Sequence, residues 1–232
     1  MLIVITQILD RNQARTLGVT IAAADWVDGN VTSGAGAALA KRNRQLPESG
    51  AAAVNARQVV QEALASSPLF LSAALPKRIF PPLFNRYGLG EGFGDHIDNA
   101  IRLLPDGSQM RTDLSATLFL NDPAEYDGGE LSIQSEFGRV AYKLEAGDML
   151  LYPSSSLHHV TEVTRGERIA SFFWIESLVR DGGAREVLFD LDQSVQALSA
   201  ERGGDDAQVL RLTKTYHNLI RRWVGYIRST FC

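Results

Sequence analysis

Two short stretches, far apart in the chain, carry side chains that could bind one metal ion together. In the first, His96 and Asp98 are separated by a single residue. Residues i and i+2 of an extended strand point to the same face, so this imidazole and this carboxylate can reach one point in space. In the second, His158 and His159 are adjacent. Two histidines and one carboxylate form the facial triad that binds non-haem Fe(II) and leaves coordination positions open.

Only one of the two adjacent histidines can complete such a triad. Neighbouring residues of a strand face opposite sides of the sheet, so His158 and His159 cannot both point inward. Their spacings to Arg168, ten and nine residues, do not decide between them. The histidine that is not a ligand is expected either to face outward or to support the ligands from a neighbouring position.

Arg168 follows a turn at Arg165-Gly166 and is predicted to enter a late strand. Its planar guanidinium can present two parallel donors to a carboxylate. This suits 2-oxoglutarate, which chelates iron through its keto-acid end and needs a fixed cation for its far carboxylate. A hydrolytic zinc site needs no such arginine. The combination therefore indicates an oxygenase that uses 2-oxoglutarate and O2.

The composition is typical of a globular protein with one large domain. The chain has 232 residues, of which 45% are hydrophobic and 22% charged. A net charge of -4 argues against nucleic acid as the main partner. No apolar run approaches the roughly 20 residues that cross a bilayer, and residues 1–9 predict a first strand, not a secretory signal. The single cysteine, Cys232, excludes a disulfide framework and suits the reducing cytoplasm.

The N-terminal region, residues 1–77, combines a strand with helices. The pattern predicts a strand over Leu2–Ile8, a helix from its cap Asp10 to about Ala24, and a helix over Asn55–Ala65. Residues 28–36 predict a loop or turn. The basic cluster Lys41–Gln45 is interpreted as a solvated face, with contact to an anionic substrate as the alternative.

Residues 78–178 predict an antiparallel sandwich or barrel, because short β-branched and aromatic runs alternate with Gly, Pro and Asp turns. The predicted strands are Ile79–Asn85, Asp113–Leu120, Gly129–Ser132, Arg139–Leu144, Asp148–Tyr152, His158–Thr164 and Glu167–Glu176. Gly147 and Asp148 are predicted to form a turn. Residues 104–112, between Arg102 and Arg111, predict a solvated loop, with a substrate-gating lid as the alternative.

Residues 179–232 predict a C-terminal helical hairpin. Ala184–Ala200 and a second run from Leu210 to Ile227 carry apolar residues at helical intervals. The hairpin is expected to pack on the sheet or to supply a surface for a homo-oligomer. Trp223 is expected to belong to its core.

The ordered motifs of the chain resemble the Fe(II)/2-oxoglutarate dioxygenases of the prolyl 4-hydroxylase type, and more closely the bacterial PKHD-type hydroxylases, the PiuC-like group. The motifs that carry the resemblance are Tyr87, Gly90, Phe93, His96 and Asp98 in sequence, Leu120-Asn121-Asp122, the Gly-Gly-Glu-Leu run at 128–131, Gly147-Asp148, and the His-x-Val-x-x-Val-x-x-Gly-x-Arg run that starts at His158. They cover about residues 78–178, and the flanks are also similar to the PKHD group.

This resemblance implies a mainly β, α+β fold: a double-stranded β-helix (jelly roll) with N-terminal helices packed on one sheet and a C-terminal helical extension. It implies that His96, Asp98 and His158 are the catalytic iron ligands, and that Arg168 binds 2-oxoglutarate. Tyr87 occupies a position near the co-substrate, with a packed core aromatic as the alternative. Trp174, on the same predicted strand face as Arg168, is expected to fill the barrel.

The resemblance further implies oxidative decarboxylation of 2-oxoglutarate to succinate and CO2, coupled to hydroxylation of an unidentified substrate. Peptidyl proline or lysine and a small molecule are the candidates. L-ascorbate is implied as a reductant of the iron, and the PiuC-like group suggests a link to iron uptake. Glu162 stands where prolyl hydroxylases usually have Pro, and Phe93 where they often have Tyr. These departures weaken any inference of the substrate from the prolyl hydroxylases. The competing hypotheses are a metal-dependent hydrolase or isomerase and a non-catalytic metal- or ligand-binding jelly roll.

Overall fold

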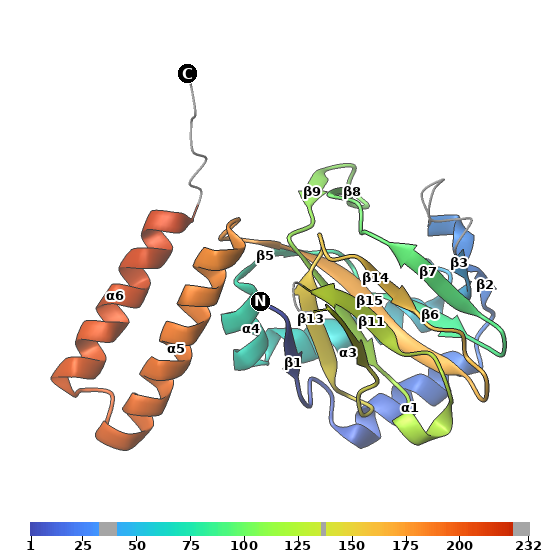
Figure 1. The fold of residues 1–232 in the computed structure, drawn as a ribbon, viewed down its shortest axis with the longest axis horizontal. Helices are drawn as coiled ribbons and strands as arrows, with labels where there is room; N and C mark the ends of the chain where they lie inside the picture. The colour runs from blue at the N-terminus through green and yellow to red at the C-terminus, as the bar shows by residue number, and fades with distance from the viewer. Residues whose placement is uncertain (33–40, 136–137, 225–232) are drawn as a thin grey trace.

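Two antiparallel sheets lie face to face in the computed structural model, which describes residues 1–32, 41–135 and 138–224 (Figure 1). The larger sheet has the order β1-β13-β10-β15-β6-β4-β2, and β5 also pairs with β15. The smaller sheet has the order β12-β11-β14-β7-β3. A separate hairpin, β8-β9, projects beside them. This arrangement confirms the predicted jelly roll.

The strands of the larger sheet are β1 (Ile3–Ile5), β2 (Val27–Asp28), β4 (Arg44–Gln45), β5 (Pro76–Ile79), β6 (Leu83–Tyr87), β10 (Leu114–Phe119), β13 (Met149–Pro153) and β15 (Arg168–Ser177). Those of the smaller sheet are β3 (Lys41–Arg42), β7 (Gly92–His96), β11 (Leu131–Ser135), β12 (Gly138–Tyr142) and β14 (His158–Val160). The hairpin consists of β8 (Ile101–Leu103) and β9 (Gln109–Arg111). The helices are α1 (Arg11–Ala22), α3 (Ala51–Ala65), α4 (Pro68–Ala74), α5 (Gly182–Arg202) and α6 (Ala207–Trp223), with short 3-10 turns η1 (Gly29–Thr32) and η2 (Pro123–Glu125).

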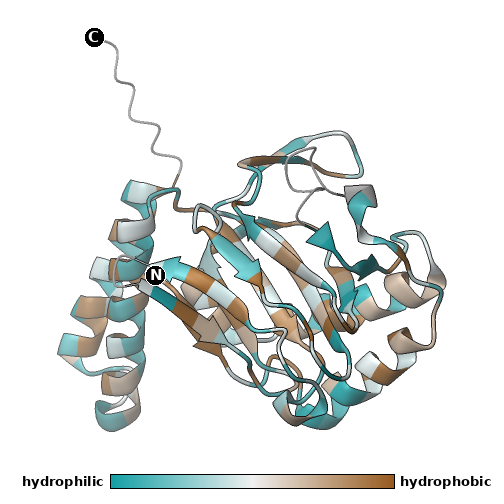
Figure 2. Ribbon diagram, turned by 45° about the vertical axis from the view of Figure 1, so that its right-hand side comes forward, coloured by the Kyte–Doolittle hydropathy of each residue, from teal (hydrophilic) through white to brown (hydrophobic). Residues whose placement is uncertain are grey.

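The larger sheet is covered on both faces, and strand β10 shows how. Leu114, Ala116 and Leu118 belong to the main core, which lies between this sheet and helices α1, α3 and α4. Phe119 belongs to a second core between the two sheets. Every residue of β10 is therefore buried. Apolar residues accordingly concentrate along the strands and on the inner sides of these helices (Figure 2).

Helix α1 begins where the sequence predicts. The Asp10 side chain accepts a hydrogen bond from the backbone N–H of Gln13 at 2.8 Å, and the Gln13 side chain accepts one from the backbone N–H of Asp10 at 3.1 Å. This reciprocal capping box satisfies two N–H groups that a helix start leaves without partners. Four buried residues then face the sheet: Ala14, Leu17, Gly18 and Ile21.

Helix α4 is absent from the sequence prediction. The predicted helix over Asn55–Ala65 ends at Ala65 as expected, but Ser67 and Pro68, which follow it, start the next helix. The Ser67 hydroxyl accepts from the Phe70 N–H at 3.3 Å, and proline at the first helical position loses no hydrogen bond. Leu75 then ends α4 in the left-handed conformation, with φ of 43°.

The prediction of a solvated loop holds for the exposed turn at residues 105–108 but is wrong for residues 109–112, where Gln109–Arg111 form strand β9. Strands β8 and β9 pair in register, with Arg102 opposite Met110. Met110 is fully buried and packs with Phe80, Leu83 and Trp174. The segment is therefore a hairpin anchored by one face to the end of the barrel.

The C-terminal helices form the predicted hairpin and lie beside the barrel (Figure 1). They pack on each other and on α4, around a small core of Leu75, Val179 and Leu188. The expected packing on the sheet is thus replaced by packing on α4. Trp223 lies against this core, as predicted. Within the described parts of the chain, no helix is both long enough and apolar enough to span a membrane.

Gly147 forms the predicted turn before β13 and is expected to tolerate no side chain. Its φ is +98°, and a Cβ atom would lie 2.1 Å from the Leu9 carbonyl oxygen. Gly147→Ala should therefore lower the free energy of unfolding by roughly 3 kcal/mol or more, in urea titration, because backbone overlap adds to left-handed strain. Gly107→Ala is the matched control: φ is +81° but nothing lies within 4 Å, so only about 1 kcal/mol is expected. Equal losses would contradict the steric argument.

Candidate metal and co-substrate site

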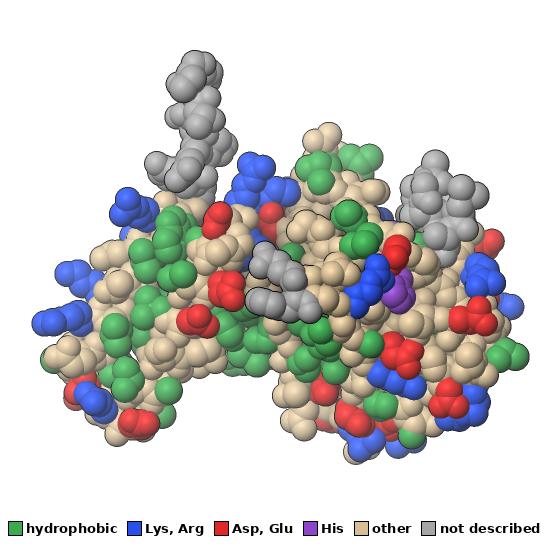
Figure 3. Space-filling view, viewed as in Figure 1, with side chains coloured by type: hydrophobic (Ala, Val, Ile, Leu, Met, Phe, Trp, Pro, Cys, Tyr) green, Lys and Arg blue, Asp and Glu red, His purple; other side chains and the backbone are tan. Residues whose placement is uncertain are grey.

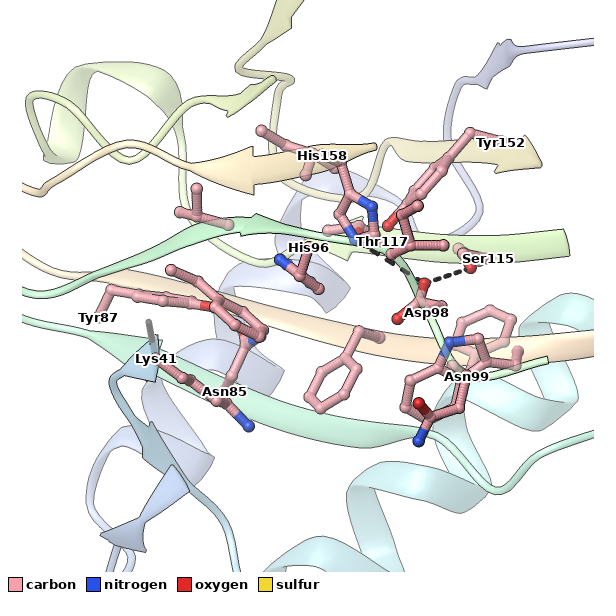
Figure 4. A pocket seen from close by; sticks show the side chains of 18 of the residues that line it. Lys41, Asn85, Tyr87, His96, Asp98, Asn99, Ser115, Thr117, Tyr152 and His158 are labelled. Atoms are coloured by element: carbon pink, nitrogen blue, oxygen red, sulfur yellow. Dashed lines mark hydrogen bonds and ion pairs between the residues drawn. The ribbon is translucent and has the colours of Figure 1, made fainter. Parts of the chain in front are cut away.

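His96, Asp98 and His158 converge at one end of the space between the sheets (Figure 4). His96 and His158 are direct partners across strands β7 and β14. Cβ atoms of such partners lie about 5 Å apart. Asp98 follows β7 by two residues and turns to the same side. One possible ligand atom from each residue lies within 4.8 Å of the others.

Both imidazoles are held with the same ring nitrogen turned toward the centre. The Nδ1 atoms of His96 and His158 lie 2.8 Å and 2.9 Å from the carbonyl oxygens of Gly94 and Ser156. A carbonyl oxygen only accepts, so each Nδ1 carries the proton and each Nε2 keeps its lone pair for a metal. Phe93 stacks on the His96 ring, with centroids 3.6 Å apart and an interplanar angle of 14°. This contact fixes the orientation of the ring.

The surroundings of the three candidate ligands keep them in a protonation state and an orientation that suit cation binding. Burial and the neighbouring His158 lower the pKa of His96 to about 4, so this imidazole is neutral at neutral pH. Asp98 accepts a hydrogen bond of 2.6 Å from the Ser115 hydroxyl, which in turn lies 2.8 Å from the Ser154 hydroxyl. The two serines hold the carboxylate in place. The sequence prediction missed them, although polar residues alternating with apolar ones over 114–119 were a usable signal.

Ser115→Ala is expected to weaken Fe(II) binding by roughly 10- to 100-fold, because partners that orient metal ligands typically contribute this much. Equilibrium dialysis under anaerobic conditions would measure it. Ser171→Ala is the matched control: Ser171 is buried on strand β15, and its hydroxyl donates to the Leu83 carbonyl, away from the triad. Similar losses in both variants would show that Ser115 acts through general stability only.

His159 faces the opposite side of strand β14. Its Nδ1 lies 2.9 Å from an Asp95 carboxylate oxygen, and Arg139 donates to the same carboxylate at 2.8 Å. Hydrogen bonds from Arg139 and His159 lower the pKa of Asp95 to about 2. The structure therefore places His158 with the other two candidate ligands, and gives His159 a separate polar cluster on the outer face.

Arg168 is fully buried, with 1% of its surface exposed, and none of its three guanidinium nitrogens makes a hydrogen bond of normal geometry with a described residue. The buried Tyr126 hydroxyl, which also lacks such a bond, interacts electrostatically with the guanidinium. Its guanidinium carbon lies 5.4 Å from the centroid of the Tyr87 ring and 5.1 Å from that of Phe119. A Cβ atom at Gly129 would approach the Arg168 side chain to 3.1 Å, so glycine leaves room for it. Burying an unpaired charge is costly. A carboxylate ligand of this arginine would remove that cost.

Tyr87 pairs with Arg168 across strands β6 and β15. It is buried at 1% exposure, and its hydroxyl accepts a hydrogen bond of 3.4 Å from the Asn85 amide. Burial raises the pKa of this phenol, so it stays neutral. The residue thus lies beside the guanidinium and lines the same pocket.

One pocket, partly open to solvent, joins the triad to Arg168. Concave sites that combine a few charged side chains with apolar walls commonly bind small molecules. Lys41 and Trp174 also line it. The prediction of a solvated face for Lys41–Gln45 holds only for Arg42 and Arg44 and is wrong for Lys41, Asn43 and Gln45, which are 6%, 5% and 1% exposed. The Lys41 ammonium donates to the Gly29 carbonyl at 2.7 Å. Trp174 forms part of the pocket wall as well as of the core.

The chain matches two protein families in separate segments. Residues 82–176 match the 2OG-Fe(II) oxygenase superfamily, and residues 182–225 match the PKHD-type hydroxylase C-terminal domain. A PKHD-type hydroxylase of Rhizorhabdus wittichii is 57% identical over 224 residues, which cover 96% of this chain and 99% of that protein. One from Burkholderia thailandensis is 58% identical over the same shares.

Solved structures support the fold. A prolyl-4-hydroxylase of Pseudomonas putida superposes with a TM-score of 0.51 at 21% identity, covering 76% of this chain and 92% of that one. A prolyl hydroxylase from Trichoplax adhaerens, solved with a peptide fragment of hypoxia inducible factor, gives a TM-score of 0.55 at 16% identity, covering 75% and 82%. The near full-length relatives decide the family. The chain belongs to the PKHD-type hydroxylases of the 2OG-Fe(II) oxygenase superfamily and is an Fe(II)- and 2-oxoglutarate-dependent hydroxylase.

Proposed function

We propose that His96, Asp98 and His158 hold Fe(II), and that Arg168 holds the far carboxylate of 2-oxoglutarate. The observation that carries this proposal is the pairing of two features in one pocket. The imidazoles of His96 and His158 and the carboxylate of Asp98 converge in one part of the pocket. The buried guanidinium of Arg168, with unused donors, lines another part of the same pocket. The donor set fits ferrous iron, and the arginine fits a dicarboxylate.

Bound Fe(II) would supply the oxidising chemistry, with 2-oxoglutarate and O2 consumed and succinate and CO2 released. The residues of the chain position the reactants. The two imidazoles present their Nε2 atoms, and Ser115 holds the Asp98 carboxylate. Arg168 binds the far carboxylate of the co-substrate and so fixes its position along the pocket. Tyr87 and Phe119 exclude water from the guanidinium, which strengthens its interaction with a carboxylate.

The test is to add Fe(II) and 2-oxoglutarate to the protein without oxygen and to record the weak visible charge-transfer band of the chelate. Oxygen is then admitted, and succinate is measured. We expect the band, followed by succinate release. Hydrolysis of an ester or phosphate with Zn²⁺ and no succinate would favour a hydrolase. Binding without succinate release under any substrate pool would favour a non-catalytic binding protein.

We also propose that the hydroxylated group is a C–H bond of a peptidyl proline or lysine or of a small molecule, in a cytoplasmic pathway linked to iron uptake. L-ascorbate is proposed to restore ferrous iron after turnover without substrate. Adding ascorbate should then prolong linear succinate release without changing its initial rate. No effect on the duration of linear release would reject this role.

The C-terminal hairpin is proposed as a surface for homo-oligomers. Hydrophobic side chains gather on the visible face of α5 and α6 (Figure 3), and Val187 and Leu210 are 52% and 55% exposed. Sedimentation of the protein and of a Val187→Glu, Leu210→Glu double variant would test this. A monomer in both cases would reject it.

A further inference from the structure

Arg102 projects from hairpin strand β8 into the pocket and has no role in the proposed iron or 2-oxoglutarate binding. Its guanidinium carbon lies 3.6 Å from the centroid of the Trp174 ring and 5.2 Å from that of the Phe80 ring. The two rings meet at 83°, so they form a corner that holds the guanidinium. The residue therefore has a fixed position on the wall of the pocket.

No hydrogen bond or ion pair joins the Arg102 guanidinium to any other residue in the described ranges. Cation–π contacts use the faces of the guanidinium and leave its N–H donors in the plane available. Burial lowers the pKa of Arg102, but an arginine stays charged in proteins. The nearest acids that act on it through space are Asp98, a proposed metal ligand, and the exposed Glu48.

The excess of positive charge in the pocket also favours an anionic ligand. Among the lining residues that the structure describes, Asp98 is the single acid, whereas Lys41, Arg102 and Arg168 are basic. The two charges of Fe(II) and the charge of Arg168 balance Asp98 and the two carboxylates of 2-oxoglutarate. The loaded pocket would then keep a net charge of about two positive units, contributed by Arg102 and Lys41.

Lys41 adds to this positive potential from the smaller sheet. Its ammonium lies 5.6 Å from the centroid of the Phe93 ring, and Phe93 itself stacks on His96. Burial and the charge of Arg102 lower the pKa of Lys41 to about 8, so the side chain remains mostly protonated at neutral pH. Two cations thus flank the triad, Lys41 from the smaller sheet and Arg102 from the β8-β9 hairpin, and both are near aromatic rings.

We propose that the substrate carries a carboxylate, which binds to Arg102 while Lys41 contributes long-range attraction. This inference rests on the proposed function, since it names the substrate class of the same site. The planar fork of Arg102 is matched to a carboxylate, and Trp174 and Phe93 provide apolar surface for the rest of the molecule. The carboxylate would fix the substrate so that a nearby C–H bond faces the triad.

The test uses benzoate and benzamide, which have the same shape and differ in charge. Each is titrated without oxygen into the protein loaded with Fe(II) and saturating 2-oxoglutarate, and the shift of the visible charge-transfer band is followed. Benzoate should bind roughly tenfold or more tightly than benzamide, as expected for one charge-assisted, two-donor contact. Arg102→Met keeps the packing on Trp174 but removes the charge and should abolish the preference. Arg102→Lys should restore part of it.

Arg42→Gln is the control for net charge. Arg42 neighbours Lys41 on β3, but its exposed side chain pairs with Glu162 at 3.1 Å, so this variant should keep the full preference for benzoate.

Equal binding of the two probes to the wild type, no binding of either, or a preserved preference in Arg102→Met would each overturn the inference. Absence of the band before any probe is added would instead reject the proposed iron and 2-oxoglutarate site. Loss of the band on adding benzoate would show displacement of 2-oxoglutarate, and would count against Arg102 as the anion site.

Discussion

Replacing His158 with alanine is expected to abolish Fe(II) binding and succinate release, whereas replacing His159 should leave both nearly unchanged. The imidazole of His158 presents Nε2 to the same point as His96 and Asp98. That of His159 lies on the other face of the strand with Asp95 and Arg139. Loss of a residue that merely orients a ligand costs about 10- to 100-fold in affinity, so loss of the ligand should exceed that.

The measurement compares the two variants in the anaerobic charge-transfer assay and then in succinate release. His158→Ala should show no band at Fe(II) concentrations that saturate the wild type. His159→Ala should keep the band and activity within about twofold, since its partners are exposed and screened by water. His158 is buried, so circular dichroism and urea unfolding of His158→Ala must show a folded protein. The reverse pattern, with His159→Ala inactive, would overturn the assignment of His158.

Local patterns in the sequence were enough to predict the regular elements that depend on neighbouring residues. The helix that starts at Asp10 has its capping box within four residues, and the late strand from Arg168 to Ser177 is rich in apolar side chains, interrupted only at Ser171 between Ile169 and Ile175. Ser67-Pro68 shows the limit of such patterns. The same residues signal both the end of one helix and the start of another, and only the packing of Phe70 into the core decides.

The residues around the triad could not be predicted, because pairing between distant strands brings them there. Ser115 on β10 of the larger sheet meets Asp98, which follows β7 of the smaller sheet, because the two sheets face each other. Lys41 is buried because β3 pairs with β7, although its sequence neighbours Arg42 and Arg44 are exposed. A basic cluster in a sequence does not reveal which of its members a later strand will cover.

Replacing Arg168 with methionine should remove measurable 2-oxoglutarate binding and, at the same time, should not destabilise the protein without the co-substrate. The guanidinium has no hydrogen-bond partner among the described residues and is surrounded by Tyr87 and Phe119. Removing a buried, unpaired charge costs little and often stabilises a protein, whereas a dicarboxylate that loses this partner should bind at least about 100-fold more weakly.

The two effects separate recognition from folding. In thermal unfolding without 2-oxoglutarate, Arg168→Met should have a Tm equal to or above that of the wild type. With Fe(II) or a non-oxidisable divalent substitute and 2-oxoglutarate at about 100 times the wild-type Kd, the wild type should gain roughly 2.7 kcal/mol of stability, and the variant should gain almost none.

Arg165→Met is the control, because Arg165 is exposed and pairs with Asp127 at 2.7 Å, outside the pocket. A co-substrate-free Tm well below that of the wild type would show that Arg168 has a satisfied structural role. An unchanged gain on adding 2-oxoglutarate would show that another cation holds the far carboxylate. Burying a charged guanidinium without hydrogen-bond partners costs free energy of folding. A carboxylate that binds to Arg168 would offset this cost, which explains why the donors are left unused in the protein alone.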